Sequence, residues 1–202
     1  MRYLRAVLAG LALFTPFAVH AATITVTLSM PNGDAYNVST GVGLVDGPVS
    51  VTFVGNTADV VASPQFYQLS SFSSASLYVG GMGTFAITDP DLFVYVNTDF
   101  DSTGYGGFVD NDGGLYISVH NDAFETYALN TSFGPYTSDS EMNGIEYANT
   151  SGGEFEFNSD QFTNVTYLAT VSGATPEPSS LALLGTGLVG LAGVARRRFV
   201  RR

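Results

Sequence analysis

Cysteine is absent from this chain of 202 residues, and basic residues are found only near its two ends. Without cysteine the protein has no disulfide bond, no thiolate nucleophile and no cysteine ligand for zinc or for an iron–sulfur cluster. The seven basic residues are all arginines: Arg2, Arg5, Arg196, Arg197, Arg198, Arg201 and Arg202. The central part of the chain therefore contains no lysine or arginine, and its only histidine is His120.

The same central part is strongly acidic. Of the eighteen acidic residues only Glu177 lies outside residues 22–175, so this part has a formal charge of −17, against −11 for the whole chain. No basic side chain is present there to neutralise phosphate, which excludes nucleic-acid binding and disfavours anionic membrane surfaces. Divalent cations and neutral, hydroxyl-rich molecules are the partners that this composition favours.

The C-terminal end consists of three segments with different chemistry. Residues 173–178 form a short linker whose prolines stop both helices and strand ladders. Residues 179–195 are an uncharged apolar run, close to the minimum that crosses a hydrocarbon core of about 30 Å. Residues 196–202 are rich in arginine, and the positive-inside rule places them in the cytoplasm. The sequence therefore predicts a transmembrane helix followed by a basic cytoplasmic tail.

This order of segments resembles the PEP-CTERM sorting signal of Gram-negative bacteria. The resemblance covers only residues 175–202 and rests on the motif Pro176, Glu177 and Pro178, the apolar run, and the membrane-stop arginines Arg196, Arg197 and Arg198. It implies that an exosortase-type enzyme processes the tail while the helix holds the protein in the inner membrane. It also implies export to the cell surface or the extracellular space.

The N-terminal end is predicted to be a signal peptide, residues 1–21. Two arginines precede an apolar stretch, and Val19-His20-Ala21 places small residues suitably for cleavage between Ala21 and Ala22. An uncleaved N-terminal anchor is the alternative. The mature domain is then expected to span residues 22–172, which is long enough for one domain with a sizeable core.

The residue pattern of this domain is that of β-strands. Polar and apolar residues alternate in Thr23–Leu28 and in Val49–Val54. Further strands are expected at Phe66–Leu69, Ser76–Val79, Thr84–Thr88, Leu92–Asn97, Leu115–His120, Phe124–Leu129, Ile145–Ala148, Glu154–Phe157 and Val165–Val171. Turn-forming residues separate them, among them Pro31–Asp34 and Asp46–Pro48. We predict an all-β fold, a single antiparallel β-sandwich of the jelly-roll or Ig-like type.

The spacing of one acidic segment partly matches that of a calcium loop. Its candidate ligands are Asp99, Asp101, Thr103, Asp110 and Asp112, and Gly104 permits a sharp turn among them. The segment departs from the EF-hand pattern at Thr103 and Asp110, and its surroundings are predicted strands. A calcium site of another geometry and a surface loop whose aspartates cap turns both fit this pattern, and calcium is the only cofactor that the sequence suggests.

The aromatic residues suggest a second kind of site. Exposed tyrosines can form platforms for sugar rings, although tyrosine also fills the cores of β-sandwiches. The candidates are Tyr67, Tyr78, Tyr95, Tyr105, Tyr116, Tyr127, Tyr136, Tyr147 and Tyr167. A Ser-His-Asp triad would have to use His120, and no Gly-x-Ser-x-Gly segment is present.

Three functions remain open at this stage. The leading hypothesis is a non-catalytic surface or extracellular-matrix protein that is exported and sorted through its tail. The second is a carbohydrate-binding or adhesive module, with or without calcium, whose partner would be an extracellular polysaccharide. The third is a secreted glycan hydrolase or lyase, which requires two carboxylates facing each other in a cleft.

Overall fold

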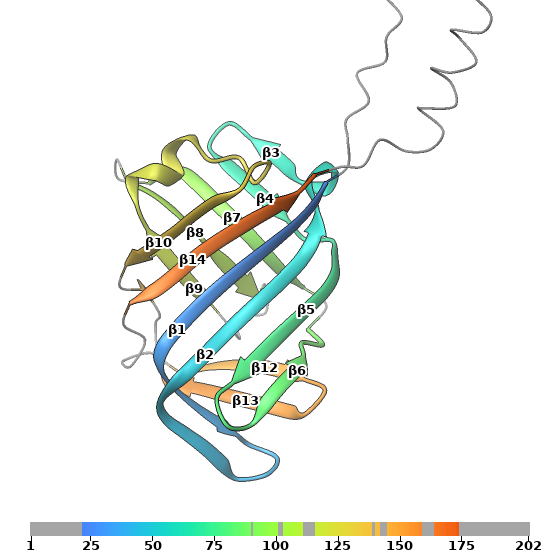
Figure 1. The fold of residues 1–202 in the computed structure, drawn as a ribbon, viewed down its shortest axis with the longest axis vertical. Helices are drawn as coiled ribbons and strands as arrows, with labels where there is room; N and C mark the ends of the chain where they lie inside the picture. Colours follow the sequence, from blue (N-terminus) through green and yellow to red (C-terminus); the bar gives the residue numbers. More distant parts are fainter. Residues whose placement is uncertain are drawn as a thin grey trace, which may run out of the picture. The chain divides into compact units, whose positions relative to one another are not determined.

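A long β-hairpin made of β1 (Thr23–Asn37) and β2 (Val42–Asn56) runs from one end of the domain to the other (Figure 1). The computed structural model describes residues 22–89, 91–100, 103–110, 116–138, 140–141, 145–158 and 164–173. In the first half of β1, Ile24, Val26 and Leu28 are buried while the residues between them are more exposed. The alternation of polar and apolar residues therefore gives the strand predicted here.

The described strands form two antiparallel sheets. The first has the order β10-β14-β1-β2-β5-β6, and β13 joins it by pairing with both β1 and β12. Its other strands are β5 (Phe72–Val79), β6 (Gly83–Ala86), β10 (Phe133–Ser138), β12 (Ile145–Thr150), β13 (Gly153–Asn158) and β14 (Val165–Ser172). The second sheet has the order β11-β9-β8-β7-β4-β3. Its strands are β3 (Val61–Ser63), β4 (Phe66–Leu69), β7 (Leu92–Phe100), β8 (Thr103–Asp110), β9 (Tyr116–His120) and β11 (Ser140–Glu141).

One hydrophobic core joins the two sheets. Phe53 on β2 packs against Phe108 on β8 with their ring centroids 5.1 Å apart, and both side chains are fully buried. The buried cluster of the described residues begins at Ile24 and ends at Ala169. The prediction of an all-β domain is confirmed. Because residues 22–173 contain this whole cluster, we expect them to fold by themselves.

Strand β1 changes its partner halfway along its length. Residues Thr23–Ser29 pair with β14, whereas Ala35–Asn37 pair with β13. Beyond β6, Ile87 forms a bridge with Thr150, so the segment after β6 hydrogen-bonds to the outer edge of β12. At this end of the domain the order β1-β2-β5-β6-β12-β13 therefore returns to β1 and closes a ring of strands.

Two segments predicted to be turns lie inside the long hairpin. Gly33 pairs with Gly47 between two irregularities in the register, and the backbone N–H of Asp46 donates a hydrogen bond of 2.9 Å to Asp34 Oδ1. Asp46 has a positive φ of 50°, a conformation that aspartate tolerates better than most residues. The predictions of turns at Pro31–Asp34 and Asp46–Pro48 were wrong because the two segments face each other and form bulges within a continuous ladder.

The predicted strand at Phe124–Leu129 was also wrong. Residues Asp122–Thr126 form a short 3₁₀ helix, η2, and the Asn121 side chain caps it by accepting a hydrogen bond of 2.9 Å from the N–H of Ala123. A second 3₁₀ helix, η1, covers Thr57–Asp59. Phe124 and Tyr127 are aromatic, as strand residues often are, and both are buried in the core. The segment nevertheless forms a helical turn, because the side chain of Asn121 caps its first residues.

The two predicted targeting segments fall outside the described residues. These segments are the signal peptide at residues 1–21 and the C-terminal helix at residues 179–195 with its basic tail. Within the part of the chain that the structure describes, no helix is both long enough and apolar enough to cross a membrane. Ala22, the first described residue, donates a backbone hydrogen bond of 3.2 Å to Thr57 Oγ1.

Candidate tyrosine face

A row of three side chains crosses the sheet where β12, β13 and β1 lie side by side. Tyr147 on β12 pairs with Glu156 on β13, and Glu156 also pairs with Tyr36 on β1. Directly paired residues in antiparallel strands point to the same side of a sheet. The three side chains therefore share one face, which we call the tyrosine face and define by Tyr36, Glu156 and Tyr147.

The opposite side of these strands forms part of the core. Phe155 and Phe157 on β13 are buried, and so are Ala35 on β1 and Ala148 on β12. The Phe155 ring packs against Phe85 with centroids 4.9 Å apart. Because side chains alternate along each strand, burial of this set directs Tyr36, Glu156 and Tyr147 outward.

The two tyrosines are exposed, and strand pairing holds their backbone positions at a defined separation. Tyr36 is 44% exposed and Tyr147 is 40% exposed, while Glu156 between them is half-buried. Successive antiparallel pairs place Cα atoms about 4.5 and 5.5 Å apart, so the Cα atoms of the two tyrosines are separated by about 10 Å. A Cβ atom built on Gly43 would lie 3.5 Å from Tyr36 Cδ2, so the Tyr36 ring leans toward the backbone of β2.

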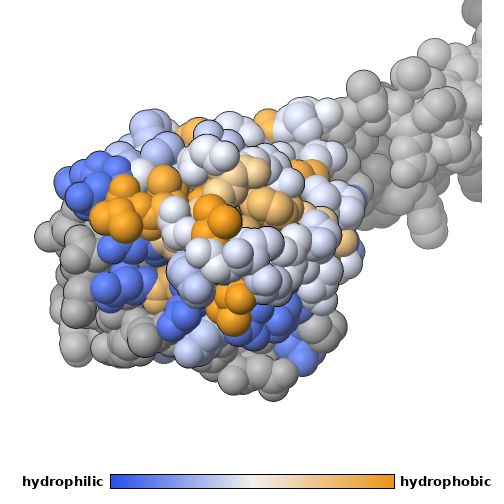
Figure 2. Space-filling model, turned by 90° about the horizontal axis from the view of Figure 1, so that it is seen from below, coloured by the Kyte–Doolittle hydropathy of each residue, from blue (hydrophilic) through white to orange (hydrophobic). Residues whose placement is uncertain are grey.

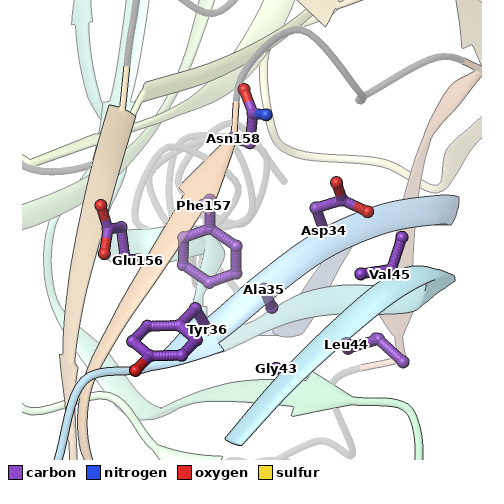
Figure 3. A pocket seen from close by; sticks show the side chains of 9 residues that line it. All are labelled: Asp34, Ala35, Tyr36, Gly43, Leu44, Val45, Glu156, Phe157 and Asn158. Atoms are coloured by element: carbon purple, nitrogen blue, oxygen red, sulfur yellow. The ribbon is translucent and has the colours of Figure 1, made fainter. Parts of the chain in front are cut away.

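A hollow with a volume of about 400 Å³ lies beside the row. It opens where β13 diverges from β1, near the bulges of the long hairpin, and its lining includes Asp34, Tyr36, Glu156 and Asn158. In the view of Figure 3, Tyr36 and Glu156 lie at one end of the hollow, and Asp34 and Val45 lie at the other. Carboxylate, amide and phenol groups therefore line, together with apolar side chains, a space that the tyrosine face borders.

Two aspartates near this face have structural hydrogen bonds. Asp89 accepts hydrogen bonds of 3.0 Å from the backbone N–H of Asn149 and 2.9 Å from its side-chain amide, which fixes the segment after β6 against β12. Asp34 accepts the hydrogen bond from Asp46 described above. Neutral amide donors therefore provide partners for carboxylates in a domain without lysine or arginine.

The tip of the long hairpin is also exposed. Asn37 fixes this tip, because its buried side chain donates to Gly152 O and accepts from the N–H of Thr40, each at 3.0 Å. Val42 and Val45 on β2 are 51% and 75% exposed. Figure 2, seen from the lower end of Figure 1, shows hydrophobic patches separated by hydrophilic side chains rather than one continuous apolar surface.

The register of β7 and β8 separates the predicted calcium ligands. Thr103 begins β8 and pairs with Phe100, whereas Asp110 ends β8 and pairs with Leu92. At about 3.3 Å per residue, the backbone positions of Asp99 and Asp110 lie about 23 Å apart along the hairpin. The structure does not bring these two residues together, and Asp101 and Asp112 lie outside the described residues. No group of three or more histidine or acidic side chains suited to a metal ion occurs among the residues described.

The glycines of β8 have a packing role. A Cβ atom on Gly104 would lie 2.6 Å from the backbone N of Glu125, and one on Gly106 would overlap the Phe124 ring. Gly104 therefore lies in a strand rather than at the sharp turn of the calcium-loop prediction. The absence of side chains lets η2 lie directly on β8.

Three of the predicted platform tyrosines are part of the interior. Tyr95, Tyr127 and Tyr167 are buried, and burial raises the pKa of both Tyr127 and Tyr167 above the ordinary value of 10.0. Among the predicted candidates, Tyr78 and Tyr147 are exposed. His120 ends β9, and its backbone N–H donates a hydrogen bond of 3.0 Å to Ser138 Oγ.

Sequence reasoning missed Tyr36. It follows the predicted turn at Pro31–Asp34 and was not among the candidate tyrosines. Its position beside Glu156, 120 residues later, depends on the pairing of β1 with β13, which no local pattern reveals.

Comparison with known families concerns the tail. The family pattern described as the PEP-CTERM protein-sorting motif matches residues 174–198. The tail is a PEP-CTERM sorting signal. This match confirms the resemblance stated above, and its range includes Pro176, Glu177 and Pro178 with Arg196, Arg197 and Arg198.

The sorting signal determines the route of the protein. A PEP-CTERM protein is exported, is anchored in the membrane during transit, and is a substrate of an exosortase-type enzyme. No curated protein and no solved structure matches the chain.

Proposed function

We propose that the chain is a non-catalytic surface or extracellular-matrix protein whose β domain, residues 22–172, is the part that acts outside the cell. The observation that carries this proposal is the PEP-CTERM motif at residues 174–198. It follows the last described strand directly, so the sorting segment and the β domain occupy separate stretches of the chain.

The hydrogen bonding of the acidic residues supports a non-catalytic role. Asp89 is held by Asn149, and Asp34 accepts the backbone N–H of Asp46, so each has a structural partner. A glycoside hydrolase needs one carboxylate as an acid and a second as a base or nucleophile. Asp34 and Glu156 line the same hollow. An activity assay must therefore test whether these two carboxylates act as a catalytic pair.

We also infer that the two sheets form a β-sandwich. The contact between Phe53 and Phe108 supports this interpretation, because it joins residues from the centres of the two sheets. A sandwich presents the outward-facing residues of its strands to the solvent, where they are available to a binding partner.

The sorting part of the proposal is tested by deletion of residues 176–202 in the native host. The deleted protein should still be exported, but it should appear in the culture medium instead of being retained with the surface fraction. A matched control replaces Pro176, Glu177 and Pro178 with alanine and keeps the apolar run. Unchanged retention of both variants would refute sorting through the tail.

The catalytic part is tested with purified domain and neutral polysaccharides. Reducing ends released over time, and abolished in Glu156→Gln, would overturn the non-catalytic proposal. No release is the expected result.

A second candidate function is a carbohydrate-binding or adhesive module. The exposed Tyr36 and Tyr147 on one face favour it, because flat aromatic rings stack on the apolar faces of sugars. Calcium assistance would require a rise in melting temperature on adding calcium, with reversal by EGTA.

A further inference from the structure

We propose that the tyrosine face binds a neutral, β-linked polysaccharide chain, with Tyr36 and Tyr147 each stacking on a sugar ring and Glu156 accepting hydrogen bonds from hydroxyl groups between them. This inference rests on the proposed surface or matrix location, and it assigns the ligand class and the residues.

The spacing of the two backbone positions carries the first step. Tyr147, Glu156 and Tyr36 are successive partners across three strands, which places the two tyrosines about 10 Å apart. This separation is close to the length of two β-linked pyranose units. Alternate rings of an extended chain then meet the two tyrosines, and the ring between them lies over Glu156.

The exposure of the two tyrosines carries the second step. Tyr36 and Tyr147 are 44% and 40% exposed, and both stand on strands whose opposite side is buried against the core. The ladder with β13 and the hydrogen bonds between Asp89 and Asn149 hold the strands in register. The strands that bear the two tyrosines are therefore fixed in register before binding, so little backbone entropy is lost when a stiff polysaccharide binds.

The charge of the domain selects a neutral chain. Residues 22–175 contain no lysine or arginine, and Glu156 lies at the centre of the row. A polysaccharide with carboxylate or sulfate groups would bring like charge to this carboxylate without a compensating cation. Hydroxyl groups, in contrast, donate hydrogen bonds that a carboxylate accepts.

The adjoining hollow extends the site beyond the tyrosines. Its volume of about 400 Å³ is sufficient for part of a sugar chain, and Asp34 and Asn158 contribute further polar groups to its lining. The sugar chain would cross Tyr147, Glu156 and Tyr36, and the last two of these residues also lie at one end of the hollow (Figure 3). Binding should therefore depend on oligosaccharide length, because one sugar ring covers only one tyrosine.

The test uses residues 22–173, which contain the whole core described above. Isothermal titration calorimetry is run with cellohexaose, mannohexaose and chitohexaose, with glucose as the short ligand and with alginate as the anionic polymer. The variants are Tyr36→Ala, Tyr147→Ala and Glu156→Gln. The matched control is Tyr78→Ala, because Tyr78 has the same 40% exposure as Tyr147 but lies on β5.

At least one hexasaccharide should bind, and glucose and alginate should bind far more weakly or not at all. Tyr36→Ala and Tyr147→Ala should each weaken the binding by roughly tenfold, as expected for loss of one central aromatic contact. Tyr78→Ala should leave it unchanged. Thermal melts of all variants show whether a loss of binding follows from unfolding. Tyr36→Phe and Tyr147→Phe, which keep the aromatic ring, should retain most of the affinity.

Three results would overturn the inference. One is the absence of binding to all three hexasaccharides, and another is an equal loss of affinity in Tyr78→Ala. The third is sedimentation showing that the face joins two copies of the domain, with dissociation in Tyr36→Ala. None of these results affects the deletion assay in the host, so failure of the glycan site is distinguishable from failure of the sorting proposal.

Discussion

Gly106 on β8 provides a sharp test of the packing between the second sheet and η2. A Cβ atom at this position would lie 3.0 Å from Cδ1 and Cζ of Phe124 and still closer to Cε1. Phe124 is fully buried, and its ring centroid is 4.8 Å from that of Phe133 and 5.0 Å from that of Tyr167. The ring therefore has no free space into which it can move.

We expect Gly106→Ala to lower the free energy of unfolding by about 2 kcal/mol. Inserting a methyl group into a filled core costs about 1–3 kcal/mol. Reduced freedom of the unfolded chain offsets about 0.5 kcal/mol of this cost. For a domain of this length, the net loss corresponds to a fall in melting temperature of about 4–8 °C.

The assay is urea unfolding followed by tyrosine fluorescence, since the chain contains no tryptophan. The midpoint should fall while the slope m stays constant, because the loss arises in the folded state. Gly43→Ala is the matched control: it also lies in a strand, but its new Cβ would meet only ordinary contacts, the nearest 3.5 Å away. It should leave stability nearly unchanged.

A double-mutant cycle separates this mechanism from a general intolerance of β8 to substitution. Adding Phe124→Leu to Gly106→Ala should cost less than the sum of the two single changes, because the smaller side chain makes room for the methyl group. Strict additivity, or wild-type stability of Gly106→Ala, would refute the reasoning.

Three further predictions concern other parts of the domain. The free energy of unfolding that the protonated Tyr127 and Tyr167 contribute should be fully present below about pH 10 and fall as the pH rises above it. The reason is that burial raises the pKa of both phenols in the folded state, so the unfolded chain releases those protons more easily. Tyr127→Phe should make this fall shallower in urea titrations at increasing pH. Asn37→Ala should lower stability by about 1–3 kcal/mol, since it removes two buried hydrogen bonds, whereas Asn130→Ala, at an exposed position, should change it by less than about 0.5 kcal/mol. Millimolar calcium should not change the melting temperature relative to EGTA, because Asp99 and Asp110 lie at opposite ends of the β7–β8 hairpin; a rise of several degrees would contradict the ligand separation.

The sequence predicted strands correctly where one face of the strand is exposed to solvent and the other is buried. Thr23–Leu28 and Val49–Val54 alternate strictly, and both lie in the long hairpin as predicted. Val165–Val171 likewise corresponds to β14. In each case the period of two reports the position of the core directly, without knowledge of strand order.

Local pattern failed where tertiary contacts decide the backbone. The glycines of β8 indicated a loop, but they allow η2 to approach the strand, and only the position of Phe124 reveals this role. Likewise, Pro31–Asp34 and Asp46–Pro48 each have the composition of a turn. Their opposition across the hairpin, with Gly33 paired to Gly47, converts both into bulges.

The candidate site was predictable in kind but not in place. The sequence suggested exposed tyrosines as platforms for sugar rings, and Tyr147 was among the candidates. Tyr36 and Glu156 became part of the same site only because β1 exchanges β14 for β13 after the bulges. The irregular residues that interrupt the hairpin therefore also create the fork at which the face and the hollow lie.

The absence of basic side chains connects the fold with the choice of ligand. In residues 22–175 the carboxylates must find their donors among backbone N–H groups, side-chain amides and hydroxyls, as Asp34 and Asp89 do. A polysaccharide presents the same kind of donor, a neutral hydroxyl, so it can bind at Glu156 without altering the charge balance of the domain. A cationic partner would instead be attracted to every acidic surface of the protein, and this attraction would weaken steeply with salt. Specific recognition at one face therefore has to come from the two tyrosine rings and their spacing, which are the features that distinguish this face from the rest of an acidic surface.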